Sequence, residues 1–442
     1  MGKEKPSNTS NPRPSSDPSD MSYIQTIGLL REEDAKMFNQ VRVQALKHHQ
    51  DVFAGDAEYE KKRLIENIQM ELVEVPTLAL LINNLPSKDA NESADQLNLE
   101  LDNESGIYPP PEKNIAGYVR IDQIKKDQRK HRIRIRQLYI KKSFRGKGFS
   151  NLLMDNAIEY SKNNIVGGSQ LEAAYVITNT TSRRIFTEKY GFTEVGTCPN
   201  WWMAKEDKPM DVTYCYKDLN PNAKPLPPLE WQKTTTTFDP ALLSRNVPTM
   251  AGRARLVVER DFDDFMLQAM IADGNWLVPE AAAAATRNKV TPSGGNLSME
   301  KYPPDRKILI TYQLDHGSFG GVIEVERITK LKRKHRAKLR IIYVREPCRH
   351  HGIATRLVNS AVIETKKRWP GVTQLEAAFD VANVNLGKTF KKAGFYATGV
   401  GPNWWIDRNG NPHHLVYTWK NISPEEKTIT VLTDDCLEKL AK

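Results

Sequence analysis

Two segments of the 442-residue chain could bind an anion, because each places a basic, glycine-containing turn between an apolar run and the start of a helix. Residues 145–150 read Arg-Gly-Lys-Gly-Phe-Ser, and residues 349–354 read Arg-His-His-Gly-Ile-Ala. The free N–H groups and the dipole at a helix start favour phosphate, and a glycine lets the backbone approach the ligand. Arginine, lysine and histidine add charge or hydrogen-bond donors. We call these segments the first turn and the second turn, and we predict that both are phosphate sites rather than plain helix caps.

The two turns belong to a duplicated sequence. Two other motifs recur at the same offset of 204 positions: Arg-Lys-His-Arg at 129–132 and 333–336, and Leu-Glu-Ala-Ala at 171–174 and 375–378. One residue is then lost, so that Pro-Asn-Trp-Trp at 199–202 matches residues 402–405. Chance does not maintain such a register, so the chain contains two copies of one structural unit. We call them the first repeat and the second repeat.

Composition changes suggest where the domains begin and end. A tail rich in Ser, Pro and Asn is expected to be disordered, an acidic stretch reads as an insertion in a hairpin, and a Pro-rich stretch reads as a linker. The expected order is tail 1–20, first repeat 21–217 with its acidic insertion 86–112, linker 218–235, second repeat 236–422 and C-terminal extension 423–442.

Hydrophobic periodicity predicts the secondary structure of each repeat. The order is a strand, helices, three strands, the basic turn, a helix, a strand, a helix and a strand. In the first repeat we expect strands at 27–30, 76–85, 117–124, 133–140 and 170–177, a strand that begins at 191–192 and one at 212–216, and helices at 32–47, 58–71, 149–160 and 182–189. Further on we expect a helix near 281–285, a strand at 308–314 and a terminal helix at 433–440, whereas residues 240–275 show no clear pattern.

The composition is that of an ordinary globular protein with a preference for acidic partners. Hydrophobic residues make up 39% and charged residues 27% of the chain, and the formal net charge of +10 favours nucleic acid, nucleotides or coenzyme phosphates. The four cysteines lack zinc-site spacing, so we expect reduced thiols and a cytoplasmic location. We expect no metal, because His350 and His351 are adjacent and have no evident third ligand. No run approaches the apolar length of a membrane span.

With this order of elements, the repeated unit resembles the GNAT superfamily of acyl-CoA-dependent N-acyltransferases. The family's turn motif is Arg-x-x-Gly-x-Gly/Ala, which the second turn matches fully and the first turn matches except for Ser150. An Asn after the following strand and a later Gly-Phe pair also fit, at Asn179 and 191–192 and at Asn383 and 394–395. The resemblance covers about residues 24–217 and, more loosely, 236–420. It implies an α/β fold of two tandem domains, each a mixed sheet splayed between its fourth and fifth strands and flanked by helices.

The resemblance also implies a cofactor, acetyl-CoA or another acyl-CoA, and the residues that hold it. Its pyrophosphate would lie on the backbone N–H groups of the turns, and its pantetheine would lie beside the end of the preceding strand. In the second repeat the implied residues are Tyr343, Val344, Arg349, His350, His351, Gly352, Ile353, Ala354 and Asn383. In the first repeat they are Ile140, Arg145, Gly146, Lys147, Gly148, Ser150 and Asn179.

The residues for proton transfer are less well defined. Amine attack on a thioester needs a neutral amine, N–H donors for the oxyanion and a proton for the thiolate. Many members of the family have a Tyr four residues before the Gly-Phe glycine, but this chain has Phe390 in the second repeat and Thr187, preceded by Phe186, in the first. The catalytic candidates are Tyr343, Glu376, Asp380 and Glu172, and the pair His350-His351 is a further possible substitute for the missing acid. A carboxylate buried in a strand could act as a base, although solvent-facing strand positions explain the two glutamates equally well.

The acceptor is expected to be an amine. The paired tryptophans Trp201-Trp202 and Trp404-Trp405 could stack on a planar acceptor such as a base, or could pack the repeats together, and packing is favoured for one of each pair. The basic segments 129–132 and 333–336 read as solvated hairpin tips or as contacts for nucleic-acid phosphates. DNA or RNA is therefore a candidate partner.

Two functions remain open at this point. One is an acyltransferase whose acceptor is a nucleic-acid base or modified nucleotide, a small amine or a protein amine. The other is a non-catalytic nucleic-acid-binding or structural protein built on degenerate GNAT folds, which the missing Tyr favours and the intact turns oppose.

Overall fold

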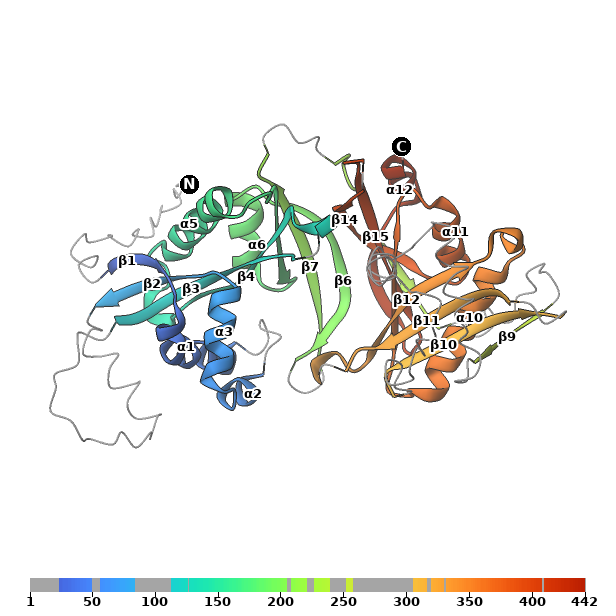
Figure 1. Ribbon diagram of the computed structural model, residues 1–442, viewed down its shortest axis with the longest axis horizontal. Coiled ribbons are helices and arrows are strands. Elements are labelled where there is room, and N and C mark those ends of the chain that lie inside the picture. The colour runs from blue at the N-terminus through green and yellow to red at the C-terminus, as the bar shows by residue number, and fades with distance from the viewer. Residues whose placement is uncertain are drawn as a thin grey trace, which may run out of the picture. The chain divides into compact units, whose positions relative to one another are not determined.

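The computed structural model describes residues 24–49, 56–83, 113–125, 127–204, 208–220, 226–238, 252–256, 305–315, 319–329, 331–407 and 409–441. The tail 1–20, the acidic insertion 86–112 and the helix expected near 281–285 lie outside these residues. The elements of the first repeat are β1 (Ile24–Leu29), α1 (Ala35–His48), α2 (Ala57–Lys61), α3 (Ile65–Glu74), β2 (Thr77–Asn83), β3 (Lys113–Gln123), β4 (Arg132–Ile140), α5 (Phe149–Asn164), β5 (Gln170–Val176), α6 (Thr180–Arg183), β6 (Thr193–Met203) and β7 (Pro209–Asp218) (Figure 1). They are followed by β8 (Trp231–Thr236), β9 (Gly252–Leu256), β10 (Lys307–Leu314), β11 (Phe319–Arg327), β12 (Arg336–Val344), α10 (Ile353–Arg368), β13 (Gln374–Asp380), α11 (Val384–Lys392), β14 (Tyr396–Ile406), β15 (Pro412–Asn421), β16 (Lys427–Leu432) and α12 (Asp434–Ala441).

These elements agree with the predicted order and differ from it in two places. The helix expected at 58–71 is divided into α2 and α3, because Leu64 adopts an extended conformation (φ −64°, ψ 140°) that ends the first helix and begins the next. The strands β8, β9 and β16 were not expected. β8 and β16 pair with each other across nearly 200 residues; β8 is rich in threonine, and β16 has only the short alternation of Ile429 and Val431.

The chain forms two compact units. The first comprises Met1–His48, Asp56–Asp122 and Ile135–Asn164, and the second comprises His49–Gly55, Gln123–Arg134 and Ile165–Lys442. In the first unit β2 pairs with both β1 and β3 in antiparallel fashion. Phe38 of α1 packs edge-on against Tyr118 of β3, at 5.1 Å between ring centroids, so this helix covers one face of that sheet.

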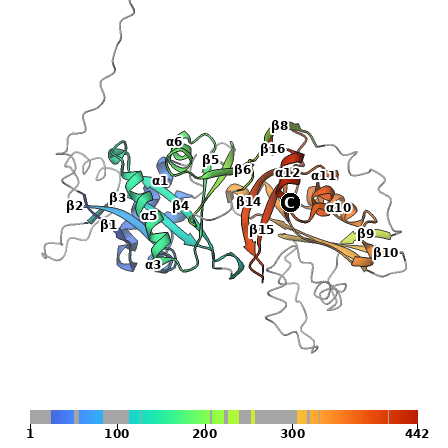
Figure 2. The same cartoon turned by 90° about the horizontal axis from the view of Figure 1, so that it is seen from above.

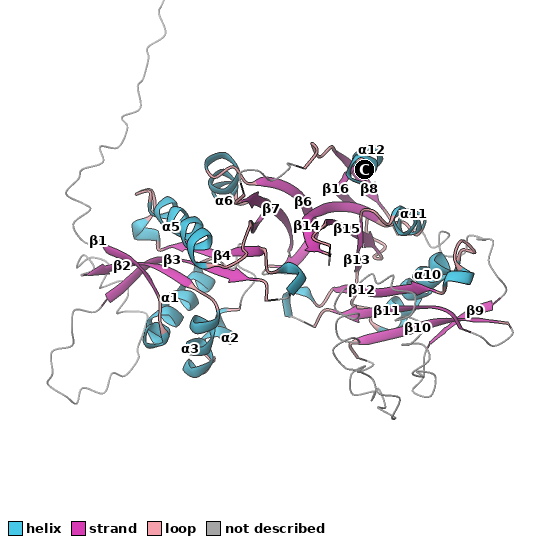
Figure 3. Cartoon of the chain, turned by 45° about the horizontal axis from the view of Figure 1, so that its top comes forward, coloured by secondary structure: helices cyan, strands magenta, loops and turns pink. Residues whose placement is uncertain are grey.

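The second unit contains the end of the first repeat and the described part of the second repeat. Its strands follow the order β5-β7-β6-β14-β15-β13-β12-β11-β10-β9. The pairs are antiparallel except for β12 with β13, and β6 meets β14 where Gly196 lies opposite Gly399. A Cβ atom on Gly196 would lie 2.2 Å from the Gly399 Cα, so this close approach of the repeats requires glycine. Helices α10 and α11 flank the sheet beside β12 and β13 (Figure 3). The predicted α/β class, with a mixed sheet flanked by helices, is confirmed.

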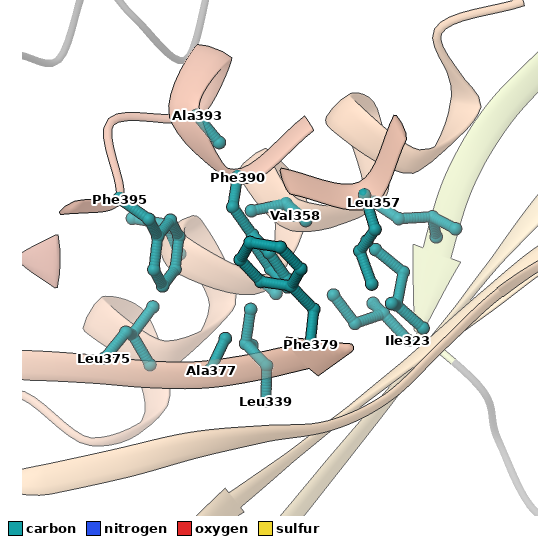
Figure 4. Close-up of a cluster of buried hydrophobic side chains, with 14 of the residues drawn as sticks. Ile323, Leu339, Leu357, Val358, Leu375, Ala377, Phe379, Phe390, Ala393 and Phe395 are labelled. Atoms are coloured by element: carbon teal, nitrogen blue, oxygen red, sulfur yellow. The ribbon is translucent and has the colours of Figure 1, made fainter. Parts of the chain in front are cut away.

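The core of the second repeat lies between this sheet and its two helices. Leu375, Ala377 and Phe379 of β13 alternate with half-buried residues, as expected of a strand with one face in the core. They pack with Leu357 and Val358 of α10 and with Phe390 of α11 (Figure 4). The core fixes α10 and α11 relative to the ends of β12 and β13, and these ends carry the candidate site.

The residues after β15 complete the second unit. β16 pairs with β8 over six residues, from Lys427 with Thr236 to Leu432 with Trp231 (Figure 2). Cys436 and Leu440 of α12 are buried in the same core as α10. The structure therefore folds part of the predicted linker and of the C-terminal extension against the second repeat.

Candidate functional site

The sheet of the second repeat opens between β12 and β13. The two parallel strands pair only from Arg336 with Gln374 to Lys338 with Glu376. β12 then continues to Val344 and β13 to Asp380, with no further pairing between them among the described residues. A bulge at Arg340 contributes to this divergence, because Ile341 pairs with Glu324 whereas Leu339 pairs with Val325. The opening faces the carboxyl ends of both strands, where parallel sheets commonly bind ligands.

The second turn closes one side of this opening. The Arg349 Nε donates to the Val344 carbonyl oxygen at 3.1 Å, so the motif arginine fastens the turn to the end of β12. The Arg145 Nε makes the same bond to the Ile140 carbonyl oxygen at 3.0 Å in the first turn. The sequence suggested only a charge for this arginine, and the structure adds an anchoring role in both repeats.

The backbone of the second turn is shaped for an anion. His350 and Gly352 have positive φ angles of 66° and 74°. Gly352 is also the N-cap of α10 and provides no side-chain cap, while Ile353 is 1% exposed and holds the helix start in the core. The first N–H groups of α10 therefore have neither an intrahelical partner nor a side-chain cap, which fits the pyrophosphate of coenzyme A. Gly146 and Gly148 have φ angles of 80° and 81° in the first turn, so the two turns share this conformation.

Gly321 lies beside the end of β12, and its equivalent in the first repeat is Gly117; steric contacts explain why both positions are glycine. A Cβ atom on Gly321 would lie 2.7 Å from the Tyr343 carbonyl oxygen, and one on Gly117 would lie 2.6 Å from the Tyr139 carbonyl oxygen. Tyr343 itself is buried in the second repeat, and burial raises the pKa of Tyr139 in the first. The glycines let adjacent strands approach closely where each strand leads into its turn.

The repeated asparagines cap the helices that follow the opening. The Asn383 Oδ1 accepts from the Leu386 N–H at 3.1 Å, and the Asn179 Oδ1 accepts from the Ser182 N–H at 3.0 Å. Asn383 thus lies just past the carboxyl end of β13, on the same edge of the sheet as Val344 and the second turn. In the first repeat the turn belongs to the first unit and Asn179 to the second unit.

The one-residue length difference between the repeats lies in these helices. Residues Arg184–Lys189 form a π-helix, in which the Tyr190 N–H donates to the Ile185 carbonyl oxygen, whereas α11 is a regular α-helix. The extra residue is absorbed in this wider turn, so Phe186 keeps the buried position that Phe390 has in the second repeat. Phenylalanine, not Thr187, therefore occupies the expected Tyr position in the first repeat, and neither repeat has an acid there.

The two candidate glutamates have structural partners. Glu376 is hydrogen-bonded and ion-paired to Arg336 and accepts from the Gln374 Nε2 at 2.8 Å. Glu172 is ion-paired to Arg132 in the same way. Both arginines are 1% exposed, so each glutamate neutralises a buried guanidinium. These contacts occur where β12 and β13 are still paired, away from the second turn, and they do not favour either glutamate as a base.

Three of the four tryptophans considered as acceptor contacts have partners within the fold that account for their presence. The Arg336 guanidinium lies 3.8 Å from the ring centroid of Trp201, and that of Arg132 lies 3.6 Å from the ring centroid of Trp404. Arg336 also donates to the Trp201 carbonyl oxygen at 2.6 Å, and Arg132 to the Trp404 carbonyl oxygen at 3.3 Å. Trp202 is buried in an apolar cluster. The faces of Trp201 and Trp404 are thus covered by arginine, which leaves Trp405 as the one of the four without such a partner in the inter-repeat packing.

The two repeated motifs therefore bind each other, and we call this the inter-repeat contact. His335 lies 2.8 Å through its Nε2 from the Asn200 carbonyl oxygen, and His131 lies 2.6 Å through its Nε2 from the Asn403 carbonyl oxygen. Burial lowers the pKa of both histidines, which are neutral donors in these bonds. The Arg-Lys-His-Arg segment of each repeat holds the Pro-Asn-Trp-Trp segment of the other, so the features that suggested nucleic acid have a structural use.

A polar cluster that the sequence analysis missed lies at the carboxyl end of β13. The Asp380 Oδ2 and the His413 Nδ1 are 2.6 Å apart, and the His413 Nε2 is 3.7 Å from the Asp407 Oδ2. Trp405 stacks on the His413 ring at 5.0 Å between centroids, with the rings 11° apart. The signal was present in the duplication, because the equivalent residues of the first repeat are apolar: Val176, Trp202, Ala204 and Met210. We call Asp380, Trp405, Asp407 and His413 the Asp380 cluster.

Comparison with known proteins agrees with this geometry. Residues 77–192 and 284–395, together just over half of the chain, match the acetyltransferase (GNAT) family. The chain therefore belongs to this family, and it is a GNAT-type N-acyltransferase that takes its acyl group from acetyl-CoA. Among curated proteins, no sequence matches the chain significantly.

Several solved structures are similar to the chain. A tandem GNAT protein from the clavulanic acid biosynthesis pathway has a TM-score of 0.41 and 13% identity, and the match covers 90% of this chain and 99% of that one. A GNAT-family acetyltransferase from Streptococcus pneumoniae has a TM-score of 0.33 and 18% identity, with 44% and 99% covered. An N-acetyltransferase from Staphylococcus aureus Mu50 has a TM-score of 0.29 and 18% identity, with 39% and 99% covered. The family match, not these distant likenesses, establishes the family.

Among the described residues, no helix is both long enough and apolar enough to cross a bilayer.

Proposed function

We propose that the second repeat holds the acetyl-CoA used by this enzyme and transfers its acetyl group to a primary amine. The observation that carries this proposal is the combination, within one compact unit, of the opening between β12 and β13 with the uncapped start of α10. The backbone N–H groups of residues 350–354 would hold the pyrophosphate, and the end of β12 at Tyr343 and Val344 would lie along the pantetheine. Acetyl-CoA supplies the acetyl thioester.

The residues of the second repeat have separate tasks in this proposal. The αL conformations of His350 and Gly352 direct backbone N–H groups toward one anion. Arg349 keeps the turn against β12, and Asn383 fixes the start of α11 beside it. Backbone N–H groups freed where β12 leaves its partner β13 are the available donors for the oxyanion.

Calorimetric titration with acetyl-CoA tests this assignment. In Gly352→Asp a side chain at φ 74° strains the turn and its carboxylate repels the phosphate, so we expect the dissociation constant to rise at least about 30-fold. Gly148→Asp makes the same change at φ 81° in the first turn and is the matched control. If Gly352→Asp binds like the unaltered protein, or only Gly148→Asp loses binding, the second repeat does not hold the cofactor.

A nucleic-acid acceptor remains a second candidate because the net charge of +10 favours polyanions. The Trp and Arg residues that first suggested it are engaged in the inter-repeat contact, which favours a smaller amine instead. Measurement of DNA and RNA binding against salt separates these acceptors, since phosphate contacts give a steep salt dependence. Weak binding with a flat salt dependence would exclude nucleic acid. The non-catalytic alternative loses support because the second turn and the opening beside it are intact.

A further inference from the structure

The Asp380 cluster has the composition of a proton-transfer site. His413 is bonded at Nδ1 to Asp380, is stacked on Trp405, and has Asp407 at 3.7 Å from its Nε2. The side chain of His413 is 28% exposed, so it is held on several sides and still reached by solvent. The carboxylate at Nδ1 selects the tautomer that leaves Nε2 as a proton acceptor.

The first repeat shows that the fold does not need this cluster. Val176, Trp202 and Met210 occupy the equivalent positions and form a buried apolar group, with Ala204 packed against it. The backbone pairing is the same in both repeats: Val176 pairs with Val212 as Asp380 pairs with Leu415, and Trp202 pairs with Met210 as Trp405 pairs with His413. Two carboxylates and an imidazole have replaced an apolar group on an unchanged backbone. The carboxylates are held in place by backbone N–H groups, those of Ala382 for Asp380 and of Asn409 and Asn411 for Asp407, so the imidazole between them is the group that these contacts leave without a structural explanation.

The cluster also lies where an acceptor could reach the opening. Asp380 is the last residue of β13, so it is at the edge of the sheet where β12 leads into the second turn. Its neighbour Phe379 faces the core beneath α10 and α11, so by strand alternation Asp380 faces the opposite side of the sheet. An amine that enters from this side would meet His413 before the thioester, with the cofactor held from the side of α10.

We propose that His413 is the general base that deprotonates the acceptor amine in the second repeat, with Asp380 as its positioning residue. This inference rests on the proposed function, because it needs acetyl-CoA in the second repeat. The ammonium form of the acceptor gives one proton to the His413 Nε2, and the freed nitrogen lone pair forms the C–N bond at the acetyl carbon as the C–S bond breaks. The nitrogen then loses its second proton, which reaches the leaving thiolate through solvent, and His413 returns the first proton to solvent, so the reaction of an ammonium acceptor releases one proton overall.

The charged groups around His413 suit this step. Asp380 of β13 and Asp407, which follows β14, both attract an ammonium ion and stabilise the imidazolium that forms, whereas the adjacent His414 of β15 donates no charge while neutral. Burial lowers the pKa of His414, so it is neutral near pH 7. The preferred acceptor is therefore a primary amine that arrives as an ammonium ion and is not strongly anionic.

The test measures thiol release from acetyl-CoA with ethylamine and spermidine as probes, using the full chain from about pH 6 to pH 9. His413→Gln should lower kcat at pH 7 at least about 100-fold, the usual contribution of a general base, with acetyl-CoA affinity changed by less than about threefold. The loss should shrink as rising pH deprotonates the amine in solution.

Asp380→Asn should lower kcat by roughly tenfold or more and leave acetyl-CoA affinity unchanged, which a merely structural role would not do. His414→Asn is the matched control, because Asn can still accept from the Asn403 N–H that bonds the His414 Nδ1 at 3.1 Å.

Each outcome decides the proposal. Equal rates for His413→Gln and the unaltered enzyme at pH 7 would overturn it, as would an equal loss in His414→Asn. Failure of the unaltered, acetyl-CoA-bound protein to accelerate either amine above the rate in solution would also overturn it. If acetyl-CoA does not bind the unaltered protein, the proposed function fails and the base assignment fails with it.

Discussion

The two repeats of this enzyme are most alike where they hold each other and least alike where β5 and β13 end. The inter-repeat contact uses the same residues in both directions, with Arg132 on Trp404 and Arg336 on Trp201 at nearly equal distances of 3.6 and 3.8 Å. At the strand ends, the position of the Asp380 cluster in the second repeat is occupied in the first repeat by the apolar group around Val176. Both repeats thus keep the duplicated scaffold, whereas only the second repeat has side chains at this position that could transfer protons.

The largest expected effect concerns the inter-repeat contact, which both repeats form with the same residues. Arg336→Met removes the buried guanidinium that pairs with the half-buried Glu376 carboxylate, which should lower the free energy of unfolding by about 3 kcal/mol. Arg132→Met should cost slightly less, because Glu172 keeps a second arginine, Arg134, at 3.7 Å. Denaturant unfolding measures both losses. If the two losses differ by more than about 2 kcal/mol, the two halves of the inter-repeat contact do not contribute equally to stability.

A second prediction separates stability from activity at the strand ends. The double variant Asp380→Val with His413→Met gives the second repeat the first repeat's residues at these two positions, and replacing a polar pair by apolar groups should change stability by less than about 1 kcal/mol. The same variant should lose at least about 100-fold in acetyl transfer to ethylamine. The reverse change, Val176→Asp alone, should destabilise the protein by roughly 3 kcal/mol, because the buried carboxylate has no histidine partner. Retained activity in the double variant would remove the functional difference between the repeats.

The histidines of the inter-repeat contact predict a pH dependence. Burial lowers the pKa of His131 and His335 in the folded protein, so their contribution to stability is complete above their unfolded pKa and is lost as the pH falls below it. Protonation would place a second buried donor on His335, whose Nδ1 has no hydrogen-bond partner among the described residues. We expect a loss of about 1.4 kcal/mol for each unit by which the pKa is lowered, beginning as the pH falls below about 6.5. Replacement of both histidines by Gln, which still offers an Nε2 donor, should flatten this part of the stability profile.

The smallest effect compares the two turns. His350 has the same left-handed conformation as Gly146, at φ 66° and φ 80°, and a side chain there costs about 1 kcal/mol. Gly146→His should therefore lower the free energy of unfolding by roughly 1 kcal/mol, and His350→Gly should raise it by no more than that. Thermal unfolding measured on both variants checks the pair. A gain from Gly146→His would contradict the equivalence of the two turns.

Much of the scaffold could be predicted from the sequence because it is local. The alternation of β4, the apolar stripe of α10 and the glycines of both turns each follow from residues close in the chain. The duplication added long-range information, since each motif had to fit one position in two copies. The pairing of β8 with β16 could not be predicted in this way, because nothing in either segment identifies its distant partner.

The residues of the candidate site also differ in whether local sequence is enough to predict them. The second turn, Asn383 and the strand ends were predicted from a motif whose members lie within a short stretch. The partners of Glu376, Trp404 and His413 come from elements that only the fold brings together, such as Arg132 for Trp404. The sequence could name Asp380 as a candidate but could not supply its histidine, 33 residues further on. A comparison of Met210 with His413 in the aligned repeats would have drawn attention to it.

The most direct test of this account is the electron density of the protein crystallised with acetyl-CoA. We predict density for the pyrophosphate on the backbone N–H groups of residues 350–354 in the second repeat, with the pantetheine in the opening between β12 and β13. Density at the first turn alone, or a cofactor placed away from both turns, would contradict the central claim that the second repeat holds the acetyl donor.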